Sequence, residues 1–284
     1  VLIGVVGEKA DLTYPYNYLG AGPESLAQFV DHAPAQKERP MFIIGQGALN
    51  RPDGAAVLAM AAKAAASLGV VKDGWNGFNI LPSEAALPGA LDIGFVPDDG
   101  GLDTAGMIKA GALDVLFLLG VDEVEVPSGA FVVYIGTHGD RGAHRADVIL
   151  PAAAYPEKSV TYVNTEGRAQ MTSRAAFPPG DAREDWAILR ALSDTLGRKL
   201  PYDSLGALRQ ALYTAYPHLA RIGQITPSNA SDIGKLAKLG GEHEKAPLRS
   251  CVSDFYFTNA ITRASAIMAE CSALAHAAAR TAAE

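Results

Sequence analysis

Four short apolar runs, rich in β-branched residues, limit the folds open to this chain. They occupy residues 1–6, 41–44, 115–119 and 131–135, and segments with helical spacing or with Gly and Pro separate them. A run that is apolar at almost every position is typical of a strand buried on both faces, as in a parallel sheet covered by helices. The alternation predicts an α/β, doubly wound fold, in which all four runs are mostly parallel strands of one buried sheet with flanking helices.

The longest succession of breaks lies at residues 136–186. An apolar run stops at Gly136, a polar loop leads to a short strand-like run that ends at Pro151, and a second β-branched run breaks at 164–168. Such breaks allow a chain to leave a sheet, turn tightly and re-enter it. The segment therefore predicts two further short strands joined by tight turns.

Charged residues gather in the same segment. Asp147, Glu157, Glu166 and Arg168 are typical of an internal ion-pair network that fastens turns, although such groups also occur in catalytic sites. We expect Arg168 to return into the fold and pair with Glu157 or Asp147. We also expect Gly167 to adopt a positive φ in the turn.

This segment resembles a known family. The matching residues are the run ADVILP at 146–151, Glu157-Lys158, Thr161, Asn164, Glu166-Gly167-Arg168 and Gln170. Together they resemble the late signature of the molybdopterin oxidoreductase superfamily. More closely, they resemble the G subunit family of respiratory complex I, NADH:quinone oxidoreductase, which is its large iron–sulfur subunit. Further similarity to that family lies at residues 11–26, 39–59, 182–193 and 254–265.

The resemblance implies the C-terminal, molybdopterin-oxidoreductase-like part of such a subunit. The fold it implies is formate dehydrogenase-like, with an α/β domain at 1–186 and a helical C-terminal extension at 187–284 that packs on it. As part of the complex the chain would belong to an enzyme, but we expect the chain alone to be non-catalytic. The first residues, which lack a Met and a signal-peptide pattern, are expected to be a strand cut from a longer protein.

The function that the resemblance implies is a redox-silent structural and subunit-docking domain of the peripheral arm. It would support upstream iron–sulfur cluster domains that carry electrons from NADH towards quinone. The implied partners are other peripheral-arm subunits of complex I and the upstream domains of the same subunit. The implied location is the cytoplasmic side of the inner membrane in bacteria or the matrix side in mitochondria. The alternative is a fragment of an active molybdopterin-dependent oxidoreductase, such as a formate dehydrogenase or nitrate reductase.

The pattern becomes helical beyond Trp186. Apolar residues at helical spacing follow it, and Gly197 is a stop signal. Shorter helical segments lie at 203–213 and 231–239, and residues 240–247, GGEHEKAP, are the best linker candidate. A final helix at about 259–282 carries an apolar stripe that needs a surface to lie on: Ile261, Ala264, Ile267, Met268, Cys271, Leu274 and Ala278.

Charge and hydropathy exclude two classes of partner. The formal net charge is −7 and the chain contains no basic run, whereas nucleic-acid binding requires clustered Lys and Arg. The most apolar helical stretch, 55–71, contains Lys63 and Ser67 and falls short of the roughly 20 strongly apolar residues that a membrane span requires. We therefore expect neither nucleic-acid binding nor direct membrane insertion.

Cys251 and Cys271 are the only cysteines, and no CxxC pair is present. An iron–sulfur cluster is usually held by four thiolates, so this chain is expected to hold no cofactor. Under the resemblance, the iron–sulfur clusters lie in the upstream part of the subunit, before Val1. Both cysteines are expected to be reduced, partly buried thiols.

A glycine pair follows the second apolar run. Gly45-Gln46-Gly47 precedes a predicted helix at 52–68, as in the turn that binds a dinucleotide pyrophosphate. However, the sixth position is Asn50 instead of Gly or Ala, and the helix starts late. The pattern therefore favours glycines that turn a strand tightly into a helix over a dinucleotide site.

The polar loop at 136–145 follows a predicted strand, and ligands of open α/β sheets bind beyond the carboxyl ends of strands. In the molybdenum enzymes that the chain resembles, this region helps to hold a pterin cofactor, and Arg141 or Arg145 would meet its phosphates. Two parts of those enzymes have no counterpart in this sequence: the metal-ligating segment and the barrel domain that covers the cofactor. We therefore expect a vestigial site.

Other candidates for chemistry have weaker patterns. His138, Asp140 and His144 lack the spacing of a metal site, and surface or interface histidines account for them better. Ser159 and Thr161 lack the glycines of a nucleophile elbow. We assign no catalytic, cofactor-binding or metal-ligating residue.

Overall fold

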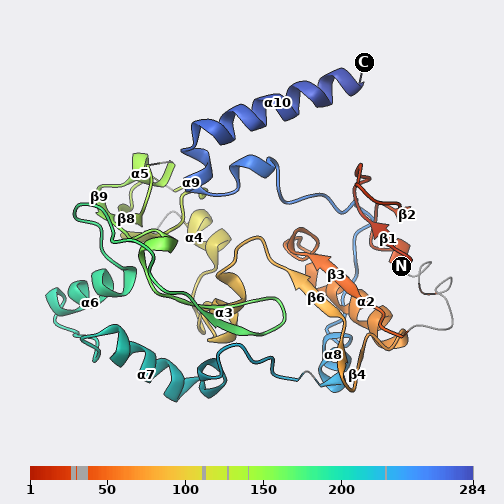
Figure 1. Ribbon diagram of the computed structural model, residues 1–284, viewed down its shortest axis with the longest axis horizontal. Coiled ribbons are helices and arrows are strands. Elements are labelled where there is room, and N and C mark those ends of the chain that lie inside the picture. The colour runs from red at the N-terminus through yellow and green to blue at the C-terminus, as the bar shows by residue number, and fades with distance from the viewer. Residues whose placement is uncertain are drawn as a thin grey trace. The chain divides into compact units, whose positions relative to one another are not determined.

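The computed structural model describes residues 1–26, 30, 38–110, 113–126, 128–139, 141–227 and 229–283, with the side chains of 109, 110 and 279–283 excepted. The chain divides into two compact units (Figure 1). Unit 1 comprises Val1–Pro88, Val163–Arg168 and Gln224–Ser253, and unit 2 comprises Gly89–Tyr162, Ala169–Gly223 and Asp254–Glu284.

Unit 1 contains two small parallel sheets. β1 (Gly4–Val6) pairs with β2 (Asn17–Gly20), and β3 (Phe42–Gly45) pairs with β6 (Phe78–Leu81). A short turn, η1 (Gln46–Ala48), follows β3, and β4 (Val71–Lys72) forms an antiparallel hairpin with β5 (Trp75–Asn76).

Two helices form the core of unit 1. α2 (Gly54–Ser67) packs against α8 (Ala230–Leu236), as Figure 1 shows. α2 is rich in alanine, the residue with the highest helix propensity. Its buried Ala62 and Ala65 cluster with Val70 and with Ile233 of α8. Phe42 and Phe78 of the β3–β6 sheet pack against the same cluster, so one face of this sheet is covered by helices.

Unit 2 is built on a three-stranded parallel sheet with the order β7–β8–β9: β7 (Val115–Leu119), β8 (Phe131–Gly136) and β9 (Val148–Pro151). The central strand β8 is buried along its length except at Phe131. On one face Val133 and Ile135 pack with Ile188 of α6 (Asp185–Thr195). On the other face Tyr134 packs with residues of and beside α5 (Arg141–Arg145). Helices therefore flank both faces of this sheet.

The other elements complete the chain. They are α3 (Leu87–Asp92), α4 (Thr104–Ala110), η2 (Tyr155–Glu157), β10 (Thr161–Val163), β11 (Ala169–Met171), α7 (Leu205–Ala215), η3 (Pro217–Ala220), η4 (Phe255–Phe257), α9 (Ala260–Arg263) and α10 (Ala266–Ala283). β10 and β11 form a two-stranded sheet.

The predicted fold class is confirmed: the structure is mixed α/β with parallel sheets, flanking helices and a helical C-terminal region. The prediction that the four apolar runs share one sheet is wrong. They lie in three sheets, because β1 pairs with β2, β3 pairs with β6, and only β7 and β8 are neighbours. The predicted burial holds for β8 but not for β3 and β7: Ile43 is 65% exposed, and Val115, Phe117 and Leu119 are 49%, 45% and 43% exposed. An apolar run does not specify which strand or helix lies beside it.

Two further predictions are corrected. The predicted final helix at 259–282 is interrupted at 264–265, so that α9 and α10 are separate helices. The predicted linker at 240–247 is part of unit 1. It is held there by Arg51, which donates hydrogen bonds to the carbonyl oxygens of Ala246 and Pro247. The predicted division into a domain at 1–186 and an extension at 187–284 stays a prediction. The two compact units described above have different bounds. No helix within the described ranges is long and apolar enough to cross a membrane.

Candidate functional site

The carboxyl ends of β7 and β8 lie side by side in unit 2, and ligands of α/β sheets bind at this position. After β7 the chain turns at Gly120, which has a φ of +66° and donates a hydrogen bond to the carbonyl oxygen of Ile135. Asp122 follows this turn, and Thr137 and His138 follow β8. We use the name carboxyl-edge crevice for the residues of these two loops, 120–124 and 136–139, which follow β7 and β8.

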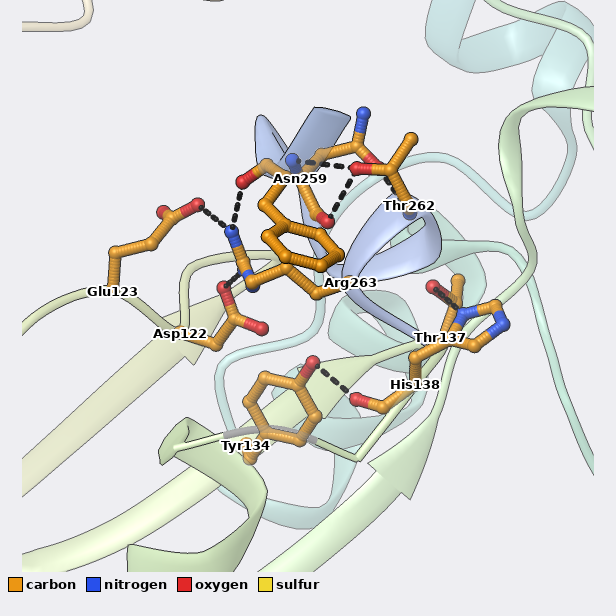
Figure 2. Close-up of polar contacts among 9 residues, drawn as sticks. Asp122, Glu123, Tyr134, Thr137, His138, Asn259, Thr262 and Arg263 are labelled. Atoms are coloured by element: carbon orange, nitrogen blue, oxygen red, sulfur yellow. Dashed lines mark hydrogen bonds and ion pairs between the residues drawn. The ribbon is translucent and has the colours of Figure 1, made fainter. Parts of the chain in front are cut away.

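Arg263, the last residue of α9, reaches into the carboxyl-edge crevice (Figure 2). Its Nη2 lies 2.6 Å from Oδ1 of Asp122, and its Nη1 lies 2.8 Å from Oε1 of Glu123. Nη1 also donates to the carbonyl oxygen of Phe257 at 3.4 Å. The Asp122 side chain is only 3% exposed, whereas the Glu123 side chain is 59% exposed. The guanidinium thus joins a buried carboxylate and an exposed one.

A capping box positions α9. Oδ1 of Asn259 accepts a hydrogen bond from the backbone N–H of Thr262, and Oγ1 of Thr262 accepts one from the N–H of Asn259. This reciprocal pair satisfies donors at the start of a helix that has only four residues. Because α9 is so short, fixing its first turn also fixes Arg263.

A second cap ties α10 to the preceding turn. Asp254 caps η4 by accepting from the N–H of Tyr256 at 2.8 Å. The hydroxyl of Ser272, a buried residue of α10, donates to the other oxygen of Asp254 at 2.6 Å. The Ser272 hydrogen bond, with that from Tyr256, lowers the pKa of Asp254 below its usual value. The segment 254–263 and α10 are therefore linked by side-chain hydrogen bonds as well as by the chain.

The residues beside these two loops are closely packed. The hydroxyl of Tyr134 donates to the carbonyl oxygen of His138 at 2.9 Å, as Figure 2 shows. A Cβ at Gly136 would lie 2.2 Å from the Tyr134 ring, and a Cβ at Gly142 would lie 3.1 Å from Cβ of Asp122. Glycine at these two positions allows the Tyr134 ring and the Cα and Cβ atoms of Asp122 to approach the backbone.

The residues of this crevice do not fit the pterin cofactor of the molybdenum enzymes that the sequence resembles. Arg145, a predicted phosphate ligand, donates to the carbonyl oxygen of Ala130 at 3.1 Å and lies 3.7 Å from Asp147. Asp122 and Glu123 bring two negative charges to a place where phosphates need hydrogen-bond donors and positive charge. The arginine that does reach the edge, Arg263, is bound by these carboxylates. The second predicted phosphate ligand, Arg141, lies exposed at the start of α5.

The candidate metal ligands are dispersed. His138 is half-buried in the loop after β8, and its Nδ1 lies 3.0 Å from Oγ1 of Thr137. His144 is exposed in α5, and Asp140 lies outside the described residues. In the part of the chain that the structure describes, no group of three or more His, Cys, Asp or Glu could hold a metal ion.

The glycine pair of unit 1 has a structural role. A Cβ at Gly47 would lie 3.0 Å from Cβ of Cys251 and 3.2 Å from the carbonyl oxygen of Arg249. The side chain of Gln46 accepts a hydrogen bond from the N–H of Ser83. The glycine thus permits close approach of the chain's own 249–251 segment, and α2 begins only at residue 54. This supports the tight-turn interpretation.

A buried ion pair lies at the start of α2. Nε and Nη2 of Arg51 donate to the two oxygens of Asp53 at 2.7 and 2.9 Å, and the N–H of Glu244 donates to Asp53 at 2.8 Å. The Arg51 hydrogen bonds lower the pKa of Asp53 to about 2. Arg51 also binds the 244–247 segment, so the pair clasps the start of α2 to the predicted linker.

The prediction for Gly167 is confirmed, since its φ is +75°. The predicted partner of Arg168 is wrong. Its ion pair is with Glu166 at 3.4 Å, and both side chains are at least one-third exposed. Oδ1 of Asn164 accepts from the N–H groups of both Glu166 and Arg168, so the turn is closed by its own residues.

The predicted partners of Arg168 are engaged elsewhere. Asp147 accepts from the N–H of Val132 at 2.8 Å, and Glu157 accepts from the N–H of Ala154 at 2.9 Å. Both carboxylates therefore fasten turns, but through backbone donors. The expected charge network is replaced by separate local contacts.

Ser159 is held by two hydrogen bonds. Its hydroxyl donates to the carbonyl oxygen of Thr172 at 2.5 Å and accepts from Arg209 at 2.9 Å. Both cysteines are free; Cys271 is half-buried as predicted, but Cys251 is exposed.

Sequence patterns did not reveal the Arg263–Asp122 and Arg51–Asp53 pairs. Arg263 lies inside a segment of family similarity, but nothing in the sequence connects it to a carboxylate 141 positions away. Arg51 and Asp53 are close in sequence, and only the burial of Asp53 distinguishes them from a surface pair.

Comparisons with known proteins agree with the sequence resemblance. Residues 1–195 match the molybdopterin oxidoreductase family, and residues 224–271 match the family of the C-terminal domain of the NADH-ubiquinone oxidoreductase G subunit. The chain is 42% identical over 282 residues to NADH dehydrogenase [ubiquinone] iron-sulfur protein 1, mitochondrial, of Solanum tuberosum, with 96% of this chain and 37% of that protein covered. It is 39% identical over 285 residues to the NADH-ubiquinone oxidoreductase 78 kDa subunit, mitochondrial, of Neurospora crassa, with 95% and 37% covered.

The chain thus spans little more than a third of the length of these relatives. The first family match covers well over half of the chain, and the second lies within its helical C-terminal region. This chain therefore belongs to the molybdopterin oxidoreductase family and carries the C-terminal domain of the NADH-ubiquinone oxidoreductase G subunit.

Proposed function

We propose that this chain is part of the large iron–sulfur subunit of an NADH:quinone oxidoreductase, complex I, and that it acts there as a redox-silent structural and docking domain. In this proposal it supports upstream domains whose iron–sulfur clusters carry electrons from NADH towards quinone. The names of the relatives and the G-subunit match at 224–271 support the assignment to this complex.

The observation that carries the proposal is the occupation of the carboxyl-edge crevice by the chain itself. A ligand-binding α/β protein keeps the carboxyl edge of its sheet open. Here Arg263 lies at that edge, and it comes from the segment, 224–271, that matches the C-terminal domain of the G subunit. The carboxylates at this edge are paired with the protein's own Arg263, which supports the proposal that no cofactor binds there.

A docking role has its own support. Ile267 and Leu274 of α10 are 68% and 64% exposed, although they belong to the apolar stripe predicted from sequence. The two side chains lie about two turns apart on one side of α10, and exposed apolar surface that is contiguous typically marks a contact surface. We propose that the partners are other peripheral-arm subunits and the upstream domains of the same subunit. The proposed location is the cytoplasmic side of the membrane in bacteria or the matrix side in mitochondria.

We also propose that the chain comprises an α/β domain at 1–186 and a helical extension at 187–284. The separate family matches at 1–195 and 224–271 support a boundary in this region.

Analysis of metal, pterin and redox activity tests the proposal. The purified chain should show no visible absorption band, no stoichiometric iron or molybdenum, and no NADH-dependent reduction of ferricyanide. The matched control is the full-length subunit purified in the same way, which should contain iron. Recovery of about one pterin per denatured chain would contradict the proposal and favour an active molybdopterin enzyme, such as a formate dehydrogenase or nitrate reductase.

A further inference from the structure

We infer that residues 254–263 form a strap over the carboxyl-edge crevice, which Arg263 latches through Asp122 and Glu123 and which opens without unfolding of unit 2. The inference concerns the crevice that the proposed function uses, but it does not depend on redox silence. Metal and pterin content test the proposed function, whereas local exchange of backbone amides tests the strap.

The first argument is the chemistry of the latch. One guanidinium contacts two carboxylates, at 2.6 Å on Asp122 and at 2.8 Å on Glu123. Both carboxylates directly follow β7, a strand of the central sheet, while the guanidinium comes from the strap. Charge-assisted hydrogen bonds of this length are among the stronger polar contacts in proteins. The latch therefore joins the strap to the sheet at a defined point.

The second argument is burial. None of the ten residues from 254 to 263 is buried, and Phe255 is 79% exposed. By contrast, all residues of β8 from Val132 to Gly136 are buried. Segments with few buried apolar contacts open at a lower free energy than core strands. Seven of the ten residues are half-buried, so the strap has less buried apolar surface than β8, and we assign the holding contact to the Arg263 ion pairs.

The third argument is mechanical continuity with α10. The chain passes from Arg263 to α10 through two residues, Ala264 and Ser265. The hydrogen bond of Ser272 to Asp254 ties α10 back to the start of the strap. α10 packs mainly against η4 and α9 (Figure 1). Any movement of α10 is therefore transmitted to the latch through these contacts.

Hydrogen–deuterium exchange of the Arg263→Gln variant tests the strap. Glutamine keeps much of the length of the side chain but removes the charge and one arm of the fork. We expect amide exchange in peptides from 254–263 to rise by ~10-fold or more, because exchange here reports local opening. Exchange in the crevice loops at 120–124 and 136–139 should rise with it. Peptides from β8 should keep their protection.

The matched control is Lys199→Gln. Lys199 also belongs to unit 2, and its contact with Asp203 at 3.3 Å joins two side chains that are both more than half exposed. This variant should leave exchange in the strap unchanged. It separates loss of the latch from loss of any positive charge.

Two results would overturn the inference. Unchanged exchange at 254–263 in Arg263→Gln would show that the ion pair does not hold the strap. A rise spread equally over the strap and β8 would show that 254–263 is an integral part of unit 2. If Arg263→Gln does not fold, Glu123→Gln carries the test, since it removes one arm and leaves the Asp122 contact. For this exposed pair an increase of up to about 5-fold, confined to the strap, supports the inference. No increase, or one shared equally with β8, refutes it.

Discussion

The two arms of the Arg263 fork should contribute very different free energies of unfolding, because they differ in burial. Asp122 has 3% of its side chain exposed and Glu123 has 59%. Two double-mutant cycles measure the difference. One combines Arg263→Ala with Asp122→Asn, and the other combines Arg263→Ala with Glu123→Gln. Each cycle isolates the pairwise coupling from the separate effects of its two substitutions.

The expected magnitudes follow from burial. Breaking a buried ion pair typically costs about 3–5 kcal/mol, because the remaining charge is left without compensation. Since Arg263 is partly exposed, we take the lower end, about 3 kcal/mol, as the upper limit for its coupling with Asp122. Arg263 is 23% exposed, and opening of the strap would return Asp122 to water, so we expect a coupling of roughly 2 kcal/mol for Arg263 with Asp122. An exposed pair contributes about 0.2–1 kcal/mol, and we expect that range for Arg263 with Glu123.

Tryptophan fluorescence during urea unfolding is the appropriate assay. The chain has two tryptophans, Trp75 in unit 1 and Trp186 in α6 of unit 2. In a Trp75→Phe background, the signal reports unit 2, which contains all three residues of the fork. Equal couplings for Asp122 and Glu123, or a coupling below about 0.5 kcal/mol for Asp122, would refute the argument from burial.

Three further predictions concern unit 1. Gly167→Ala should lower the free energy of unfolding by about 1–2 kcal/mol from backbone strain alone, because the φ is +75° and a Cβ there meets nothing within 4 Å. A smaller loss for Gly167→Asn, in a urea titration followed by Trp75 of unit 1, would confirm the cause. Gly47→Ala should displace the 249–251 segment and lower the free energy of unfolding of unit 1 in the same titration, and an unchanged value would contradict the packing role. The pKa of Asp53 is lowered from 3.8 to about 2, chiefly by Arg51, so the clasp stabilises the fold fully above the ordinary pKa and loses this contribution as pH falls through about 2. In Asp53→Asn the free energy of unfolding should therefore fall less steeply between pH 3.8 and about 2 than in the parent. An unchanged pH dependence in this range would argue against the Arg51–Asp53 clasp.

Local backbone and burial requirements explain what could be predicted from the sequence. The run at 131–135 is apolar at every position, and it forms β8, which is buried from Val132 onward. Alanine-rich sequence formed α2, and Gly167 and Gly197 adopted the positive φ expected of turn and helix-stop glycines. These features depend on residues within one element, so a single chain segment contains the information. Family membership was predictable for the same reason, since it rests on a contiguous signature.

Partner choice was decided only by the tertiary structure. The apolar runs did not specify that β1 pairs with β2 and β3 with β6. Arg168 pairs with Glu166 because its turn closes on Asn164, and a charge in the sequence does not identify its counterion. Asp122 is buried against Arg263 only because segments 141 positions apart meet at the end of β7. Burial and ion pairing are properties of packed surfaces, and these exist only after the strands and helices have found their neighbours.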